Sequence, residues 1–203
     1  MRDVRMSNML LGGAHAVLTE LVRVFPRLGT HASLLDVGTG LADIPIKART
    51  LAERRGIHLT TVGLDESAML AQQSLAHLSA AICADARRLP FADHSVDLVT
   101  CSQVLHHFDD SEIHGVVAEL NRVARVAVVV SDLRRSWVAA SGFWLASWPL
   151  NFHEVTRHDG ITSVLRGFTA AELSSSVEAA TGQHATVRRH PGYRITATWS
   201  PRI

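Results

Sequence analysis

Two glycines that follow a short apolar segment form the most informative motif of this sequence. The segment reads Ser33-Leu-Leu-Asp36-Val-Gly38-Thr-Gly40. Glycines permit a sharp strand-to-helix turn and let the backbone approach a ligand, while the first amides of the following helix are unpaired. The motif therefore indicates a ligand site at a strand end, although a Gly-x-Gly pair alone fits equally well a turn that binds nothing.

The residues after the glycines exclude two common ligands. A phosphate-binding loop ends in Gly-Lys-Ser or Gly-Lys-Thr, which is missing here. A dinucleotide fingerprint has a third glycine three positions after Gly40, and that position is Asp43. An acid there repels pyrophosphate and suits a ligand that carries an ammonium group.

Two further acids follow at the ends of the next predicted strands. Val62-Gly-Leu-Asp65 places a carboxylate where it can accept hydrogen bonds from both hydroxyls of a ribose. Cys83-Ala-Asp85-Ala86 places another within reach of an adenine amino group. One acid at a strand end is unremarkable, but two in register after a glycine turn predict a nucleoside site.

Alternating strands and helices must position these residues. The predicted strands cover 33–37, 58–64, 80–84, 95–101 and 125–131, and the predicted helices cover 14–25, 44–55, 67–78 and 111–123. This alternation predicts a parallel sheet with helices on both faces. Ser111 is expected to cap the last of these helices.

The C-terminal part of the chain has a different pattern. A helix is predicted over 169–181, and residues 185–189 and 194–199 alternate on either side of Pro191-Gly192. The expected fold class is therefore α/β, Rossmann-like and doubly wound, mostly parallel with an antiparallel C-terminal strand. An N-terminal helix and a helical insert after the fifth strand complete it.

Composition limits the classes of protein that fit. A chain of 203 residues with 47% hydrophobic residues suits one domain. Twenty basic and 19 acidic residues leave no basic arm, so no nucleic-acid partner is expected. Cys83 and Cys101 lie in predicted buried strands, which fits reduced thiols in the cytosol. No signal peptide is predicted at the N-terminus. No membrane span is predicted either, because polar residues, Gly and Pro interrupt the apolar stretch 137–152.

From residue 33 to about residue 132 the sequence resembles the class I methyltransferases that use S-adenosylmethionine (AdoMet). It is most similar to the small enzymes of the ubiquinone/menaquinone biosynthesis type. The motifs occur in order as Leu-Leu-Asp36-Val-Gly-Thr-Gly, Val-Gly-Leu-Asp65, Ala-Asp85-Ala-Arg-Arg-Leu-Pro-Phe and Ser95-Val-Asp-Leu-Val-Thr-Cys-Ser-Gln-Val-Leu-His-His. Ala42 departs from the pattern, because many members carry a third glycine there. The resemblance implies a seven-stranded sheet.

The resemblance also implies AdoMet as cofactor and assigns residues to it. Glycines back the methionine end, Asp36 orders the loop, Asp65 takes the ribose, and Asp85 with the amide of Ala86 takes adenine. The expected cofactor-binding set is Asp36, Gly38, Thr39, Gly40, Asp43, Asp65, Glu66, Asp85, Ala86 and Ser102. An adenine-N6 enzyme is not expected, because the fourth strand ends in Thr-Cys-Ser-Gln, and no metal-binding carboxylate set of the catechol type is found.

His106 and His107 directly follow the fourth strand, at the rim where the methyl group should emerge. Methyl transfer is an in-line displacement, and a hydroxyl acceptor must lose its proton to a base, a role that suits histidine. In similar natural-product O-methyltransferases, a histidine here and an acid after strand five can form the base system, and Asp132 is that acid. For either histidine alone, packing or loop capping is an equal alternative.

The insert after the fifth strand carries three tryptophans. Trp137, Trp144 and Trp148 are spaced by seven and four residues and share a helix face. This face either packs into the core or, with the leading helix, forms a lid over a hydrophobic acceptor. The expected substrate-binding residues are Arg134, Trp144 and His153, and further polar groups nearby are Arg135, Arg157, His158 and Asp159.

These observations predict one methyltransferase domain over residues 1–203. Its parts are a leading helical lid (1–31), a cofactor-binding core (32–132), a helical insert (133–168) and a C-terminal helix with a hairpin (169–203). We expect a cytoplasmic monomer or homodimer that methylates a small aromatic or hydrophobic natural product, most readily at oxygen. The alternatives are a catalytically silent AdoMet-binding regulator and an RNA or protein methyltransferase.

Overall fold

A seven-stranded sheet forms the centre of the molecule. The computed structural model describes residues 13–148 and 154–202. The strands are β1 (His31–Val37), β2 (His58–Asp65), β3 (Ala80–Cys83), β4 (Val96–Ser102), β5 (Ala124–Leu133), β6 (Thr186–His190) and β7 (Arg194–Trp199). Their order is β3-β2-β1-β4-β5-β7-β6, with β1 to β5 parallel and β7 antiparallel to both β5 and β6. The predicted fold class and the antiparallel C-terminal hairpin are confirmed.

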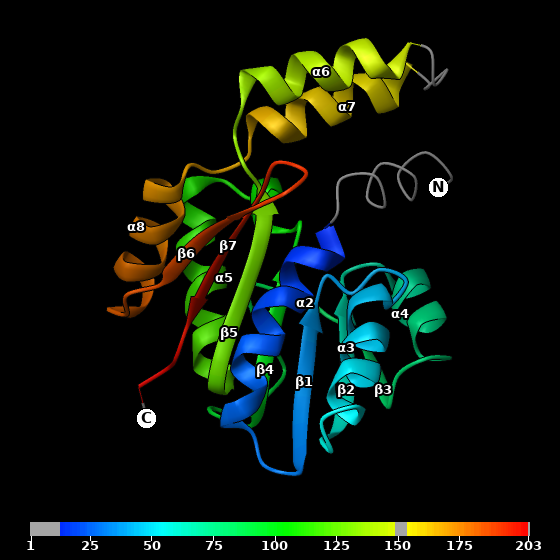
Figure 1. The fold of residues 1–203 in the computed structure, drawn as a ribbon, viewed down its shortest axis with the longest axis vertical. Helices are drawn as coiled ribbons and strands as arrows, with labels where there is room; N and C mark the ends of the chain where they lie inside the picture. Colours follow the sequence, from blue (N-terminus) through cyan, green and yellow to red (C-terminus); the bar gives the residue numbers. More distant parts are fainter. Residues whose placement is uncertain (1–12, 149–153, 203) are drawn as a thin grey trace.

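Helices cover both faces of this sheet (Figure 1). They are α2 (Gly13–Val24), α3 (Asp43–Glu53), α4 (Ala68–Ser74), α5 (Asp110–Val123) and α8 (Ala170–Thr181). Residues of α5 and α8 pack with Val128 and Val130 in one core cluster, and residues of α2 and α3 pack with Ala127 and Val129 in another. Because both sides of β5 are buried along its centre, apolar residues are favoured on both faces there, which explains the unbroken valine-rich run 126–130.

The helix α5 begins earlier than expected. Asp109, not Ser111, is its N-cap, and Glu112 completes a capping box with it. The expectation that Ser111 caps this helix was therefore wrong. The start of α8 has the same device, formed by Thr169 and Glu172.

Cys83 corrects a second expectation. It is exposed, whereas Cys101 in the central strand β4 is buried as predicted. Cys83 is the last residue of β3, which lies at the edge of the sheet and is only partly covered. Its thiol donates to the carbonyl oxygen of Glu66 at 3.3 Å. Edge position, which the sequence pattern does not reveal, is the reason for the difference.

The insert after β5 forms a helical hairpin of α6 (Trp137–Ser147) and α7 (Glu154–Leu165), which extends beyond the carboxyl ends of the strands (Figure 1). Trp137, Trp144 and Trp148 are exposed by 74%, 45% and 58%. The interpretation of these tryptophans as core residues is therefore wrong. The hairpin instead packs Ala140 of α6 and Val164 of α7 against Leu133, the last residue of β5.

The leading helix α2 belongs to the core. Val17 and Leu21 are fully buried, and the helix contacts α3, β5, β7 and β4. The first twelve residues of the expected leading lid lie outside the described residues. Within the described part of the chain, no helix is long and apolar enough to cross a membrane.

Candidate active site

The glycine turn after β1 is held against the end of β2. The amides of Gly38 and Thr39 both donate to the carbonyl oxygen of Leu64, at 2.8 and 3.0 Å. Gly38 has a φ of +72°, and a Cβ atom there would lie 2.2 Å from a methyl group of Val104. Only glycine fits this position, so the turn leaves its backbone open toward the carboxyl end of the sheet.

Ala42, which departs from the family pattern, adopts a conformation that glycine favours. Its φ is +64°, and it is the N-cap residue of α3. The glycine found there in many relatives would adopt this conformation without strain. Asp43 begins α3 and is exposed, so its carboxylate lies at the positive end of the helix dipole.

Asp36 lies at the end of β1 and is 2% exposed. The hydroxyl of Thr100 in the neighbouring strand β4 donates to its carboxylate at 2.6 Å. Burial raises the pKa of Asp36 to about 6 from its ordinary value of 3.8, although the Thr100 hydrogen bond opposes this shift. A buried acid beside the turn favours a ligand with a positive group, because such a group stabilises the ionised carboxylate.

Asp65 brings the second acid to the glycine turn. One oxygen of its carboxylate accepts from the amide of Gly40 at 2.9 Å, and the other accepts from the amide of Ser67 at 3.0 Å. A carboxylate has about four acceptor sites, so capacity for ligand hydroxyls remains. Its neighbour Glu66 is exposed.

The third acid, Asp85, is already engaged by a neighbour. Arg87 forms an ion pair with it at 2.8 Å and, through side-chain hydrogen bonds, holds the pKa of Asp85 below its ordinary value. Arg87 also bridges to Glu112 at 2.7 Å, while Ala86 is buried. Contact with an adenine amino group would therefore use the acceptor sites of Asp85 that Arg87 leaves open.

Two buried hydroxyls beside the turn indicate that a polar ligand fits here. The side-chain oxygens of Thr39 and Ser102 have no hydrogen-bond partner among the described residues. Both lie at carboxyl ends of central strands, Thr39 after β1 and Ser102 in β4. Unpaired buried hydroxyls are costly, so a bound group with polar atoms would satisfy them.

His106 and Asp132 form a buried pair at the ends of β4 and β5. His106 Nδ1 lies 2.7 Å from Asp132 Oδ1, and the backbone amide of His106 donates to Oδ2 at 3.2 Å. The amide of Leu133 also donates to Oδ1, at 2.7 Å. With Asp132 ionised, this network assigns the ring proton to Nδ1 and leaves Nε2 with a free lone pair. The arrangement can accept a proton.

A buried arginine that the sequence analysis missed lies near this pair. Arg194 of β7 is fully buried, and burial lowers its pKa to about 10, while attraction to Asp132 opposes the shift. Its guanidinium therefore remains charged at neutral pH and attracts the carboxylate of Asp132. Its position in an alternating strand gave no sign of this contact, which depends on β7 pairing with β5.

His107 stands beside the pair without joining it. Its ring centroid lies 4.1 Å from that of His106, and its side chain is the more exposed of the two. Burial lowers the pKa of His107. The structure thus joins His106 to Asp132 and leaves His107 at the edge of the adjoining cavity.

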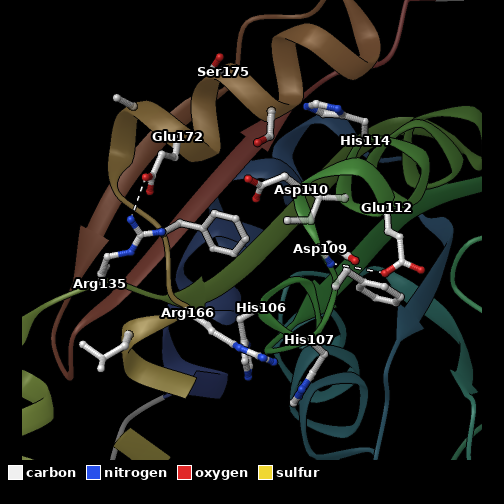
Figure 2. Close-up of a pocket in the computed structure, with 16 residues that line it drawn as sticks. His106, His107, Asp109, Asp110, Glu112, His114, Arg135, Arg166, Glu172 and Ser175 are labelled. Carbon is white, nitrogen blue, oxygen red and sulfur yellow. Dashed lines mark hydrogen bonds and ion pairs between the residues drawn. The ribbon is translucent and has the colours of Figure 1, made fainter. Parts of the chain in front are cut away.

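A cavity of about 1030 Å³ opens where these histidines lie (Figure 2). It is lined by the short helix η2 (Leu105–His107), the start of α5 and the segment that joins α7 to α8. Among the residues expected to bind substrate, Arg134 and Trp144 do not line it, and His153 lies outside the described residues. Arg134 instead stacks over the ring of Tyr193 at 5.1 Å.

Of the other polar residues expected near the insert, some line the cavity and others do not. Arg135 lines the cavity, where it pairs with Glu172 at 2.9 Å, whereas Arg157 lies over the ring of Trp148 at 4.0 Å. Arg166 also lines the cavity and was missed. The capping box Thr169–Glu172 fixes the start of α8 and could have placed Arg166 in the loop before it.

Known proteins share both the motifs and the fold. A family model described as a methyltransferase domain matches residues 35–129. Demethylmenaquinone methyltransferase of Thermotoga maritima is 29% identical over 122 residues, which make up 57% of this chain and 52% of that protein. The chain thus aligns with about half the length of this curated relative.

Solved structures of methyltransferases have a similar fold. A SAM-dependent methyltransferase from Aquifex aeolicus has a TM-score of 0.66 at 15% identity, covering 97% of this chain and 93% of its own. Magnesium protoporphyrin IX methyltransferase from Synechocystis, solved with bound SAM, has a TM-score of 0.62 at 13% identity, covering 99% and 83%. At these identities the likeness is one of fold.

Proposed function

We propose that this chain, which carries a class I AdoMet-dependent methyltransferase domain, methylates a small aromatic or hydrophobic acceptor, and that the acceptor atom is oxygen. The observation that carries the choice of oxygen is the His106–Asp132 pair, with 2.7 Å between Nδ1 and Oδ1, beside a cavity at the strand ends. A hydroxyl acceptor needs a base, and this pair has the geometry of one.

The residues around the glycine turn fit the cofactor. When bound, AdoMet supplies an activated methyl group on a sulfonium centre. We assign its methionine end to the backbone of Gly38 and Gly40, and its ribose hydroxyls to the open acceptor sites of Asp65. The unpaired hydroxyls of Thr39 and Ser102 offer further contacts to polar groups. Buried Asp36 adds negative charge near the cationic ligand.

His106 would act as the general base. Its Nε2 lone pair accepts the proton of the acceptor hydroxyl, which makes the oxygen a stronger nucleophile. Asp132 holds the imidazole in the required tautomer and stabilises the imidazolium that results, and the amide of Leu133 keeps the carboxylate in place. A positioned base of this kind contributes roughly 10²–10⁴-fold to rate.

The cavity supports a small acceptor with an aromatic part. Its volume of about 1030 Å³ is near the upper end of small-molecule sites, which run to roughly 1,000 Å³. Phe108, Ile113, Leu165 and Phe168 provide apolar surface within it. The near balance of 20 basic and 19 acidic residues favours a small molecule over a nucleic acid as partner.

Two measurements test the proposal. Calorimetry with AdoMet and with its demethylated product should show binding of both. Mass spectrometry of phenols and polyketides incubated with protein and AdoMet should then show products that have gained one methyl group. AdoMet binding without transfer to any member of a broad panel would favour the silent regulator instead. Absence of binding to either compound at millimolar concentration would contradict the cofactor site itself.

A further inference from the structure

Three of the charged side chains that line the cavity next to His106 are already compensated within the protein. Arg135 pairs with Glu172 at 2.9 Å, and Glu112 pairs with Arg87 at 2.7 Å. The starts of α5 and α8 also face the cavity, and each carries the glutamate of its own capping box. The negative charge of these glutamates disfavours an anion at either helix start.

Arg166 differs from Arg135, the other arginine that lines the cavity. Within residues 13–148 and 154–202, its guanidinium takes part in no ion pair or hydrogen bond, although it lines the same cavity. Figure 2 shows its side chain at the end of the cavity where His106 and His107 lie. Its charge reaches His107, where it acts with burial to lower the pKa of that imidazole.

The backbone fixes where Arg166 begins. Its amide donates to the carbonyl oxygen of Thr162 at 2.9 Å, and the amide of Phe168 donates to that of Leu133 at 2.8 Å. Gly167 packs so tightly against the end of β5 that a Cβ atom there would lie 2.5 Å from the Leu133 oxygen. The loop therefore presents the arginine from a constant position on β5.

We propose that Arg166 binds a carboxylate of the methyl acceptor, so that the acceptor is an aromatic hydroxy acid. This inference rests on the proposed function, which places the hydroxyl at His106. The planar guanidinium matches a carboxylate with two parallel hydrogen bonds. Phe108 and Phe168 also line the cavity and offer aromatic surface suited to a ring.

Acidic groups near the cavity limit where such an acceptor can lie. Asp109 and Asp110 stand at the start of α5 and are exposed. They would repel a carboxylate placed at that side of the cavity. The anion therefore belongs beside Arg166, which lies at the junction of α7 and α8.

A binding experiment tests this without requiring turnover. Three hydroxy acids, para-hydroxybenzoate, para-hydroxyphenylacetate and para-hydroxyphenylpropanoate, are each compared with their primary amides by calorimetry in the presence of the demethylated cofactor. At least one acid should bind about tenfold more tightly than its amide, because a hydrogen bond to a charged group is lost in the amide. The series varies the distance between ring and carboxylate.

Variants assign the preference to a residue. Arg166→Gln should reduce the preference for the acid over its amide to about twofold or less. Arg166→Lys should keep part of this preference, and the AdoMet affinity of both variants should stay unchanged. Lys47→Gln is the matched control, because it removes the same charge from an exposed position on α3, away from the cavity. It should keep the full preference.

Three results would overturn the assignment: equal binding of every acid and its amide, an acid preference that survives in Arg166→Gln, or no binding of any of the six compounds. The outcome is separable from that of the proposed function. Methylation of neutral phenols without an acid preference would remove the subsite and leave the function standing. Acid binding through Arg166 without methyl transfer would support the Arg166 subsite and contradict the proposed function.

Discussion

At the scale of single residues, the site places ionisable side chains where water is scarce. Asp36, His106 and Asp132 are all buried, and each is held by hydrogen bonds from a neighbouring strand or loop. Burial of a charge is costly unless partners compensate it. The site therefore depends on individual hydrogen bonds, and the raised pKa of Asp36 makes folding depend on pH.

Asp36 gives a pH dependence whose sign can be worked out. Its pKa is about 6 in the folded protein and 3.8 is its ordinary value, so the folded state binds more protons than the unfolded state between these values. Stability must then fall as pH rises from 4 to 6, by about 3 kcal/mol for this one group. In urea unfolding, Asp36→Asn should lack this loss, so its stability relative to wild type should increase over that range. Parallel pH profiles for the two proteins would refute the assignment.

Asp65 allows a test of the cofactor site. Asp65→Ala removes the acceptor of the Gly40 amide and the proposed partner of the ribose hydroxyls. Loss of hydrogen bonds to a charged acceptor costs roughly 1.5–3 kcal/mol each, so AdoMet affinity measured by calorimetry should fall about tenfold or more. Glu53→Ala, which removes an exposed acid at the end of α3, should bind AdoMet as wild type does. An unchanged affinity of Asp65→Ala would dismiss its role.

At the scale of elements, the alternation of strands and helices could be predicted well from the sequence. Helices and buried strands differ in the spacing of their apolar residues. The hairpin β6–β7 followed in the same way from alternation around Pro191-Gly192. Details that depend on neighbours could not be predicted. The exposure of Cys83 comes from the edge position of β3, and the start of α5 at Asp109 comes from a capping box that competes with Ser111.

The glycine turn makes an element-scale prediction. Gly38→Ala introduces strain at a φ of +72° and drives a methyl group into Val104, so it should lower the free energy of unfolding by about 2 kcal/mol or more and weaken AdoMet binding. Gly182→Ala is the control. That glycine has a φ of +67° with open space around it, so it should lose about 1 kcal/mol and keep its affinity. Equal losses in both variants would show that strain, not the close approach, governs the turn.

At the scale of the whole molecule, the two halves of the site differ in how far sequence could predict them. The residues proposed for the cofactor lie at the ends of parallel strands or soon after them, so parallel topology alone brings them to one edge of the sheet. The cavity combines residues near His106, Arg135 and Arg166, which are separate in sequence and meet only because α5 packs against α8. The insert's tryptophans, the most conspicuous residues in the sequence, are exposed, and Trp144 does not line this cavity.

The central claim is that the His106–Asp132 pair assists methyl transfer to an oxygen acceptor. The most direct measurement is kcat of His106→Gln on a hydroxyl acceptor that the wild-type protein methylates, together with its AdoMet affinity and with His107→Gln as the matched control. We predict that kcat of His106→Gln falls roughly 10²–10⁴-fold while AdoMet affinity is kept, and that His107→Gln retains most of its activity. Full activity in His106→Gln would contradict base catalysis by this pair.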